Sequence, residues 1–246
     1  MNARRQEGMG VPNGYPPSCD FGLLVHYQPI CDDTNHVVYQ EALARLKSDD
    51  SLMYPCQFLA ALRRAGKISE FTSCVLIEIC ETLHRSGVDV PIAINVPRNA
   101  IDDELSFMLL DVIEMFGIAP ERLVIEVTED EEGFERDLVV PLLGLSAYGI
   151  RFVLDDYVGS ETQQKTLKVF LFETVKIDCL YTQTLDAIRL DSMFRTLREL
   201  FVQTVIIKGV ETDSHENWLN ELRERYPYLD IQAQGFRYAL PSAHIH

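Results

Sequence analysis

The segment R-F-V-L-D-D (residues 151–156) runs from largely apolar, β-prone residues straight into two adjacent acids, Asp155 and Asp156. A short apolar run of this kind is typical of a strand buried in a parallel sheet. Two carboxylates side by side at its end repel each other, so they need a cation or a shared proton. The segment therefore predicts a buried strand that carries a charged site at its carboxyl end.

Polar residues follow apolar runs at several other points in the chain. Each run has the length of a strand, and the residues at the run ends are Asn95, Glu126, Lys176 followed by Asp178, Lys208 and Gln234. In a barrel of parallel strands, the carboxyl ends of many strands build one active site together. The pattern predicts a single site assembled from several strands.

Strands and helices alternate along most of the chain, which favours parallel βα units. Strands are expected at 22–30, 37–46, 91–96, 122–127, 151–155, 173–177, 203–207 and 230–234. Helices are expected at 55–65, 69–86, 104–116, 134–148, 186–201 and 213–225, with a short one inside 157–170. About eight strands favour a closed barrel over an open sheet. The first two strands, joined by a turn at 32–35, read as an antiparallel hairpin and depart from the regular barrel pattern.

Length and composition set the outer limits. With 246 residues and 47% hydrophobic content, the chain can bury the core of one barrel-sized domain or two small ones. The Gly- and Pro-rich start predicts a flexible leader over 1–20, with the barrel domain over 21–246. A run of about eighteen apolar residues, which a membrane helix needs, is absent from the sequence.

Charge and cysteine usage narrow the class of partner. A formal net charge of -16 argues against direct DNA binding, because nucleic-acid phosphates would be repelled. The six cysteines are scattered without a C-x-x-C pair. This pattern favours a reduced, cytoplasmic protein over a disulfide or zinc framework.

Five residues carry the strongest chemical signal: Glu41, Asn95, Glu126, Asp155 and Asp156. Hard oxygen ligands of this kind suit Mg²⁺, Mn²⁺ or Ca²⁺ rather than zinc. Two divalent ions held by bridging carboxylates are a standard arrangement for hydrolysing a phosphodiester. The competing interpretation is that acids at strand ends are solvated or cap the following helix. Their occurrence in phase at successive strand ends favours the metal interpretation.

Short blocks spread over residues 20–243 make the chain resemble the EAL domain family, the bacterial cyclic-di-GMP phosphodiesterases. The blocks are Y-Q-P-I (27–30), Q-E-A-L-A-R-L (40–46), P-C-Q-F-L (55–59), I-N-V-P (94–97), L-V-I-E-V-T-E (123–129), V-L-D-D (153–156), V-K-I-D (175–178), G-V-E-T (209–212) and Q-G-F (234–236). The resemblance implies an α/β fold, a modified (β/α)₈ TIM-like barrel with one antiparallel strand. It also implies Mg²⁺ or Mn²⁺ as cofactor, with Ca²⁺ as an inhibitory substitute.

The resemblance also implies roles for individual residues. Glu41, Asn95, Glu126 and Asp155 would hold a first metal, and Asp155 with Asp156 a second. Lys176 would orient the attacking water or a phosphate oxygen, so Glu41 and Lys176 are candidate catalytic residues. Glu129 would tie down the loop after Asp156. Candidate contacts to the nucleotide are Gln28, Arg45, Asp178, Gln234 and Pro241.

Two features depart from the family pattern. Where the family has A-E-G-V-E-T, this chain has I-K-G-V-E-T, so Lys208 replaces the expected acid of the second metal site. A lysine cannot bind a cation, and its charge opposes one. After the paired acids the chain reads Y-V-G-S-E-T-Q-Q (157–164) instead of F-G-T-G-Y-S-S-L, with Val158 in place of a flexible glycine. A softer change is Pro97 where serine is common.

Three functional hypotheses follow. The first is a degenerate EAL domain, a poor or null phosphodiesterase that acts as a regulator by binding cyclic-di-GMP, a protein partner, or both. The second is a working hydrolase that cuts cyclic-di-GMP to pGpG; here Lys208 swings away and Glu211 supplies the missing carboxylate. The third is a protein-binding module that has lost the nucleotide. The oligomeric state, monomer or homodimer, is left open.

Overall fold

A computed structural model describes residues 21–48, 51–128 and 136–245. Within them lies a nine-stranded sheet, of which β3 (Ser51–Met53) pairs only with the end of β2. The other strands close into a ring in the order β1, β9, β8, β7, β6, β5, β4, β2 and back to β1. Their bounds are β1 (Leu23–Cys31), β2 (Val37–Ser48), β4 (Ile92–Pro97), β5 (Leu123–Thr128), β6 (Arg151–Tyr157), β7 (Thr174–Ile177), β8 (Thr204–Lys208) and β9 (Asp230–Gln234).

Strand β1 is the exception in an otherwise parallel barrel. It runs antiparallel to both β2 and β9, while every other neighbouring pair in the ring is parallel. The structure confirms the expected TIM-like barrel with one antiparallel strand, and the opening hairpin is its β1–β2 pair. The leader expected over 1–20 lies outside the described residues.

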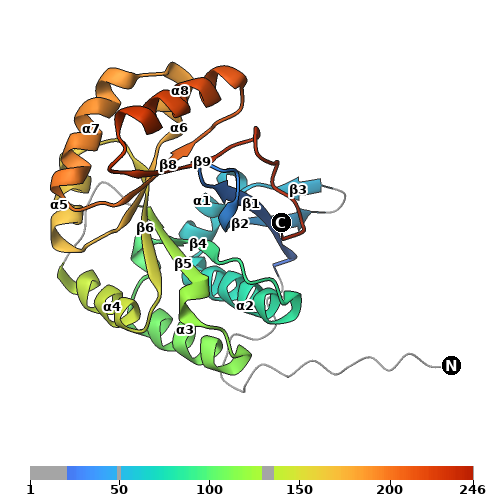
Figure 1. Cartoon of the computed structure of the whole chain (residues 1–246). Helices are drawn as coiled ribbons and strands as arrows, with labels where there is room; N and C mark the ends of the chain where they lie inside the picture. The colour runs from blue at the N-terminus through green and yellow to red at the C-terminus, as the bar shows by residue number, and fades with distance from the viewer. Residues whose placement is uncertain (1–20, 49–50, 129–135, 246) are drawn as a thin grey trace.

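Helices surround the barrel (Figure 1). They are α1 (Pro55–Arg64), α2 (Ile68–Ser86), α3 (Asp103–Phe116), α4 (Arg136–Ala147), α5 (Glu161–Val169), α6 (Cys179–Thr184), α7 (Ala187–Glu199) and α8 (Asp213–Arg225), with 3-10 turns at Arg98–Ala100 and Pro120–Arg122. Side-chain oxygens of Asp102, Ser160 and Thr212 cap the starts of α3, α5 and α8. Glycines in the left-handed region, Gly87 and Gly117, end α2 and α3.

The elements agree closely with those expected, with two additions. Strand β3 has only three residues and α6 only six. Segments this short do not complete a hydrophobic period, so the sequence pattern could not distinguish them from loops.

The interior of the barrel is arranged in layers. One layer is an apolar cluster contributed by six strands: Ile30, Tyr39, Ala93, Val124, Val153 and Ile206. Side chains two residues apart on a strand share a face. One step toward the carboxyl ends of the parallel strands therefore gives a second layer, which is polar: Gln28, Glu41, Asn95, Glu126, Asp155 and Lys208. These six residues, all expected at the site, therefore lie in one interior layer of the barrel.

Two further expectations concern cysteines and membrane helices. Among the described residues, Cys31, Cys56, Cys80 and Cys179 are free thiols and Cys74 is disulfide-bonded, so the expectation of a reduced protein does not hold for Cys74. None of the helices in the described ranges is long and apolar enough to cross a membrane.

Candidate functional site

Lys176, on β7 next to Ile206 of the apolar layer, extends its ammonium to two members of the polar layer. Its ammonium donates to Glu41 Oε2 and to Glu126 Oε2, both at 2.7 Å. The three side chains come from β7, β2 and β5, and that of Lys176 is 0% exposed. Buried charges are tolerated only when each has a partner of opposite charge and is hydrogen-bonded, and the contacts of Lys176 with Glu41 and Glu126 meet both conditions.

The two glutamates respond differently to the shared lysine. Burial by itself would raise the pKa of Glu41, but the ammonium of Lys176 and three hydrogen bonds outweigh it and lower that pKa from 4.5 to about 2. Burial and the neighbouring Glu41 charge raise the pKa of Glu126 well above its ordinary value. Burial also opposes the charge of Lys176, yet Glu126 and Glu41 hold its pKa above the ordinary value. One ammonium therefore serves two carboxyl groups whose pKa values are shifted in opposite directions.

Amide side chains complete the environment of Glu41. Asn95 Nδ2 donates to Glu41 Oε1 and Gln234 Nε2 to Glu41 Oε2, both at 2.7 Å. Gln234 also contacts Gln28 Oε1 at 3.3 Å, and Gln28 donates to the Ala239 carbonyl at 3.2 Å. The structure thus joins β1, β2, β4, β7 and β9 through one hydrogen-bonded network.

Lys208 lies against the paired acids. Its ammonium is 2.9 Å from Asp155 Oδ1 and also donates to Asp156 Oδ1. Its side chain is 18% exposed. Burial favours the neutral amine, but Asp155 and Asp156 outweigh it and hold the pKa of Lys208 above its ordinary value. The lysine supplies the positive charge that adjacent carboxylates require.

Gln163 was missed by sequence reasoning, although it controls the backbone beside Asp156. Its Oε1 accepts from the backbone amides of Val158, Gly159 and Ser160 at 2.9, 3.1 and 3.3 Å. Its Nε2 donates to the Asp156 carbonyl at 2.9 Å. Asp156 itself has a φ of 51°, an uncommon value for a residue with a side chain. The spacing from Ser160 to Gln163 is that of a capping box, which was the available signal.

Other expected contacts lie apart from this network. The Arg45 guanidinium donates to the Ala44 carbonyl and stacks over Tyr54. Asp178 caps α6 through the amide of Leu180. Pro241 is half-buried just before Ser242, whose backbone pairs with Tyr27. The remaining two are exposed Glu211, whose amide contacts His215 Nδ1, and Glu129, which lies outside the described residues.

The residues present fit a first cation better than a second. Glu126 Oε1 is buried and has no hydrogen-bond partner, an open acceptor of the type that a hard cation takes. Between Asp155 and Asp156, however, the position is taken by the ammonium of Lys208. Across the described part of the chain, no group of three or more His, Cys, Asp or Glu side chains is arranged to hold a metal.

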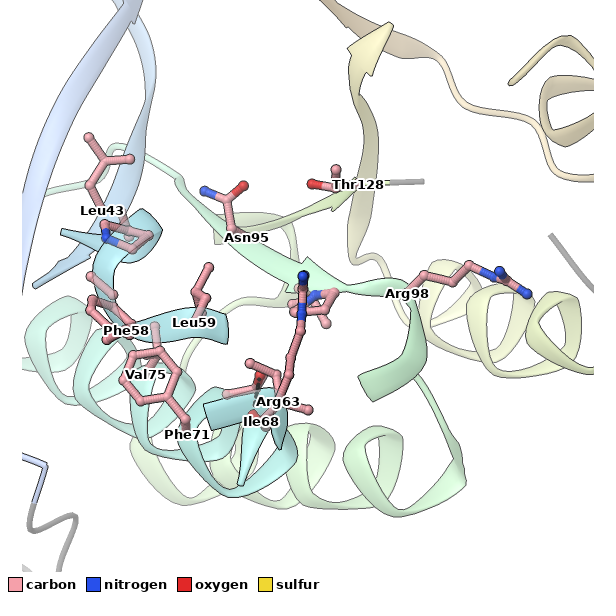
Figure 2. A pocket seen from close by; sticks show the side chains of 16 residues that line it. Leu43, Phe58, Leu59, Arg63, Ile68, Phe71, Val75, Asn95, Arg98 and Thr128 are labelled. Carbon is pink, nitrogen blue, oxygen red and sulfur yellow. Dashed lines mark hydrogen bonds between the residues drawn. The ribbon is translucent and has the colours of Figure 1, made fainter. Parts of the chain in front are cut away.

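A cavity of about 710 Å³ opens beside Asn95 (Figure 2). Its walls come from β2, α1, α2 and β4, and Thr128 at the end of β5 faces it. The floor is apolar, with Phe58, Leu59 and Phe71, while Arg63 and Arg98 bring positive charge. A mostly apolar cleft with a few convergent polar groups, next to residues of perturbed pKa, is the usual form of a small-molecule site.

The chain belongs to the EAL domain family, whose model matches residues 21–227. It is 25% identical over 214 residues to the probable cyclic di-GMP phosphodiesterase PdeA of Escherichia coli K12, covering 83% of this chain. It is 28% identical over 239 residues to the cyclic di-GMP phosphodiesterase NbdA of Pseudomonas aeruginosa, covering 90% of this chain. The chain spans 29% of the length of each.

Solved structures agree with the fold. The PaMucR phosphodiesterase in complex with c-di-GMP matches with a TM-score of 0.79 and 27% identity, over 90% of this chain and 97% of that one. A standalone EAL protein from Vibrio cholerae, in its c-di-GMP-bound form, matches with a TM-score of 0.74 and 20% identity, over 92% of this chain and 94% of that one. At that identity the second match supports the fold alone.

Proposed function

We propose that this chain is a catalytically impaired EAL domain that acts in bacterial cyclic-di-GMP signalling as a regulator, through binding of the nucleotide, a protein partner, or both. The observation that carries the proposal is the position of the Lys208 ammonium between Asp155 and Asp156. In this proposal the lysine takes the place of a second divalent cation at the site expected to generate the nucleophile.

The energetic reason is charge repulsion. At an effective dielectric of about 20 and a separation of about 4 Å, two unit charges interact by about 4 kcal/mol, and a divalent ion doubles that figure. A second cation would have to displace Lys208 from two carboxylates before it could bind. Without that cation, a bound water is less readily deprotonated near neutral pH.

Nucleotide binding is compatible with the retained residues. Gln28 and Gln234 are already held in one hydrogen-bonded network, while Arg45 is on β2 and Asp178 directly follows β7. The related PaMucR phosphodiesterase was solved with c-di-GMP. We assign Gln28, Arg45, Asp178, Gln234 and Pro241 to nucleotide contact, and Glu41, Asn95 and Glu126, with Asp155, to a single Mg²⁺ or Mn²⁺.

The decisive experiment is a hydrolysis assay on the purified chain. Cyclic-di-GMP is incubated with Mg²⁺ or with Mn²⁺, and the products are separated by chromatography. The expected result is intact substrate, followed by calorimetric detection of nucleotide binding in Ca²⁺. Many turnovers to pGpG would overturn the proposal. Absence of both turnover and nucleotide binding would leave the chain a protein-binding module.

The second candidate is an active phosphodiesterase. The observation that favours it is the convergence of Glu41, Asn95 and Glu126, which a protein without metal chemistry has no need to retain. The curated relatives that carry the phosphodiesterase name point the same way. It requires Lys208 to leave the paired acids when metal and substrate bind, so Lys208→Glu should then change turnover little.

A further inference from the structure

A second cavity, of about 600 Å³, lies at the amino-terminal end of the barrel strands, opposite the polar layer. Tyr39, Val124, Val153, Thr174, Thr204 and Gln232 line it from the strands. The loop before β6 and the α5–β7 connection add Ile150, Phe170 and Leu171. This end of a parallel barrel normally serves stability and is filled by apolar side chains. The polar side chains that line this cavity do not fit that pattern of apolar filling.

Gln232 supplies the strongest sign of a ligand. Its side chain is buried, with the residue 9% exposed, and its Nε2 donates to Asp230 Oδ2 at 2.6 Å. This bond identifies the remaining atom, Oε1, as the acceptor, and Oε1 has no hydrogen-bond partner. A buried acceptor without a partner costs about 1–3 kcal/mol, so a donor is expected to reach it. Tyr39, also buried, has a hydroxyl without a partner.

The charges around the cavity define the sign of the ligand. Asp230 and Glu173 bring two carboxylates, and Thr204 Oγ1 and Gln232 both donate to Asp230. Against them stands the guanidinium of Arg151, which donates to the Glu121 carbonyl. Carboxylates and an open amide oxygen together favour a ligand that is positively charged and rich in hydrogen-bond donors.

The wall of the cavity is aromatic and aliphatic. Phe152 and Phe170 pack edge to face with ring centroids 5.4 Å apart. Leu143 and Leu171 lie at the rim and are more than half exposed. These two exposed leucines at the cavity mouth offer apolar contact to an incoming ligand.

From these observations we infer that the amino-terminal end of the barrel holds a binding site for a small primary amine with an apolar body. The ammonium donates to Gln232 Oε1 and faces Asp230, and the apolar body packs on Leu143 and Leu171 at the cavity mouth. This site is separate from the nucleotide site of the proposed function, because the two open at opposite ends of the strands.

The test uses 2-phenylethylamine as the probe at neutral pH, where it is charged. Saturation-transfer NMR and calorimetry on the whole chain should detect binding. Phenylacetate, which has the same body and the opposite charge, should not bind. Gln232→Leu should weaken probe binding at least tenfold. Excess cyclic-di-GMP should not displace the probe, whatever the outcome of the hydrolysis assay.

A second variant keeps the inference testable if Gln232→Leu does not fold. Leu171→Arg changes a residue that is 56% exposed at the rim, so it places a repelling charge at the mouth without disturbing the core. Ile188→Arg, at a position 88% exposed and outside the cavity, is the matched control. Leu171→Arg should weaken binding while Ile188→Arg leaves it unchanged. No binding to the parent chain, or equal binding by all variants, overturns the inference.

Discussion

The ammonium of Lys208 lies 2.9 Å from Oδ1 of Asp155, although the two residues are 53 positions apart in the chain. Lys208 is on β8 and Asp155 on β6, with β7 between them in the barrel, and both residues belong to the polar layer. Asp156, the next residue, accepts from the same ammonium. An internal cation therefore occupies the position between the two acids, and its effect can be measured.

Replacement of Lys208 should restore affinity for a divalent cation. Lys208→Met removes the charge and Lys208→Glu adds an acid, so metal affinity should rise in that order. We expect at least tenfold for the glutamate variant, because removal of one close like charge is worth more than about 1.4 kcal/mol. Calorimetry with Mn²⁺ measures the affinity, and Lys168→Met, at an exposed position on α5, is the control. Equal affinities in all variants would contradict the prediction.

Lys176 is expected to be essential for stability. Lys176→Met leaves Glu41 and Glu126 buried without their cation. Loss of one partner of a buried ion pair costs about 3–5 kcal/mol. Urea unfolding in metal-free buffer should show a loss in that range, against less than about 0.5 kcal/mol for a surface lysine. A loss of stability no larger than that of the surface-lysine control would contradict the role of Lys176 as the buried partner of Glu41 and Glu126.

Glu41 and Glu126 should behave differently when each is changed to glutamine. Because burial and the Glu41 charge disfavour the charged form of Glu126 and raise its pKa, Glu126→Gln should cost the metal-free protein less free energy of unfolding than Glu41→Gln does. Glu41→Gln removes the ionised partner of Lys176 and should be strongly destabilising. Urea midpoints of the two variants test this, and similar losses would contradict it.

The pH dependence of stability follows from the same contrast. The folded pKa of Glu41, about 2, lies below its ordinary value of 4.5. Its contribution to stability is therefore present above pH 4.5 and is lost as the pH falls toward 2. Between pH 4.5 and pH 2, the free energy of unfolding should fall more steeply with decreasing pH for the parent chain than for Glu41→Gln. The same pH dependence of stability in both proteins would show that folding does not lower the pKa of Glu41.

Gln163 should hold the loop after Asp156 in place. Gln163→Leu removes the acceptor of three backbone amides and the donor to the Asp156 carbonyl. Hydrogen exchange at residues 158–160 should become faster, with a stability loss of about 2 kcal/mol. Gln164→Leu, which removes a single bond to the Gly159 carbonyl, is the matched control. Unchanged exchange in Gln163→Leu would exclude the role.

Gly235 should tolerate no side chain. A Cβ added there would lie 2.1 Å from the Val210 carbonyl oxygen and 2.4 Å from its nitrogen, both backbone atoms that cannot move aside alone. Gly235→Ala should destabilise the chain by about 3 kcal/mol or more. Gly144→Ala, in α4 with no atom within 4 Å of the added Cβ, should be neutral or slightly stabilising. Thermal unfolding of both variants provides the comparison.

Much of the fold can be predicted from the sequence, because βα alternation and helix periodicity are local properties of the chain. The apolar run that ends at Asp156, and the similar runs elsewhere in the chain, predicted buried strands with polar ends. Several of those polar end residues form the polar layer in the structure. Gln163 was not recognised because its four hydrogen bonds depend on a loop conformation that residue type does not specify. Strand β3 was missed because it pairs only with the end of β2.

Local sequence patterns are enough to specify the βα order, the single antiparallel hairpin and the polar residues at the strand ends. Tertiary structure alone decided which charge neutralises which: Lys176 with Glu41 and Glu126, and Lys208 with Asp155 and Asp156. The reason is physical. Strand identity depends on residues a few positions apart, whereas an ion pair inside a barrel depends on closure and register between strands far apart in the chain, together with the burial that makes an unpaired charge costly.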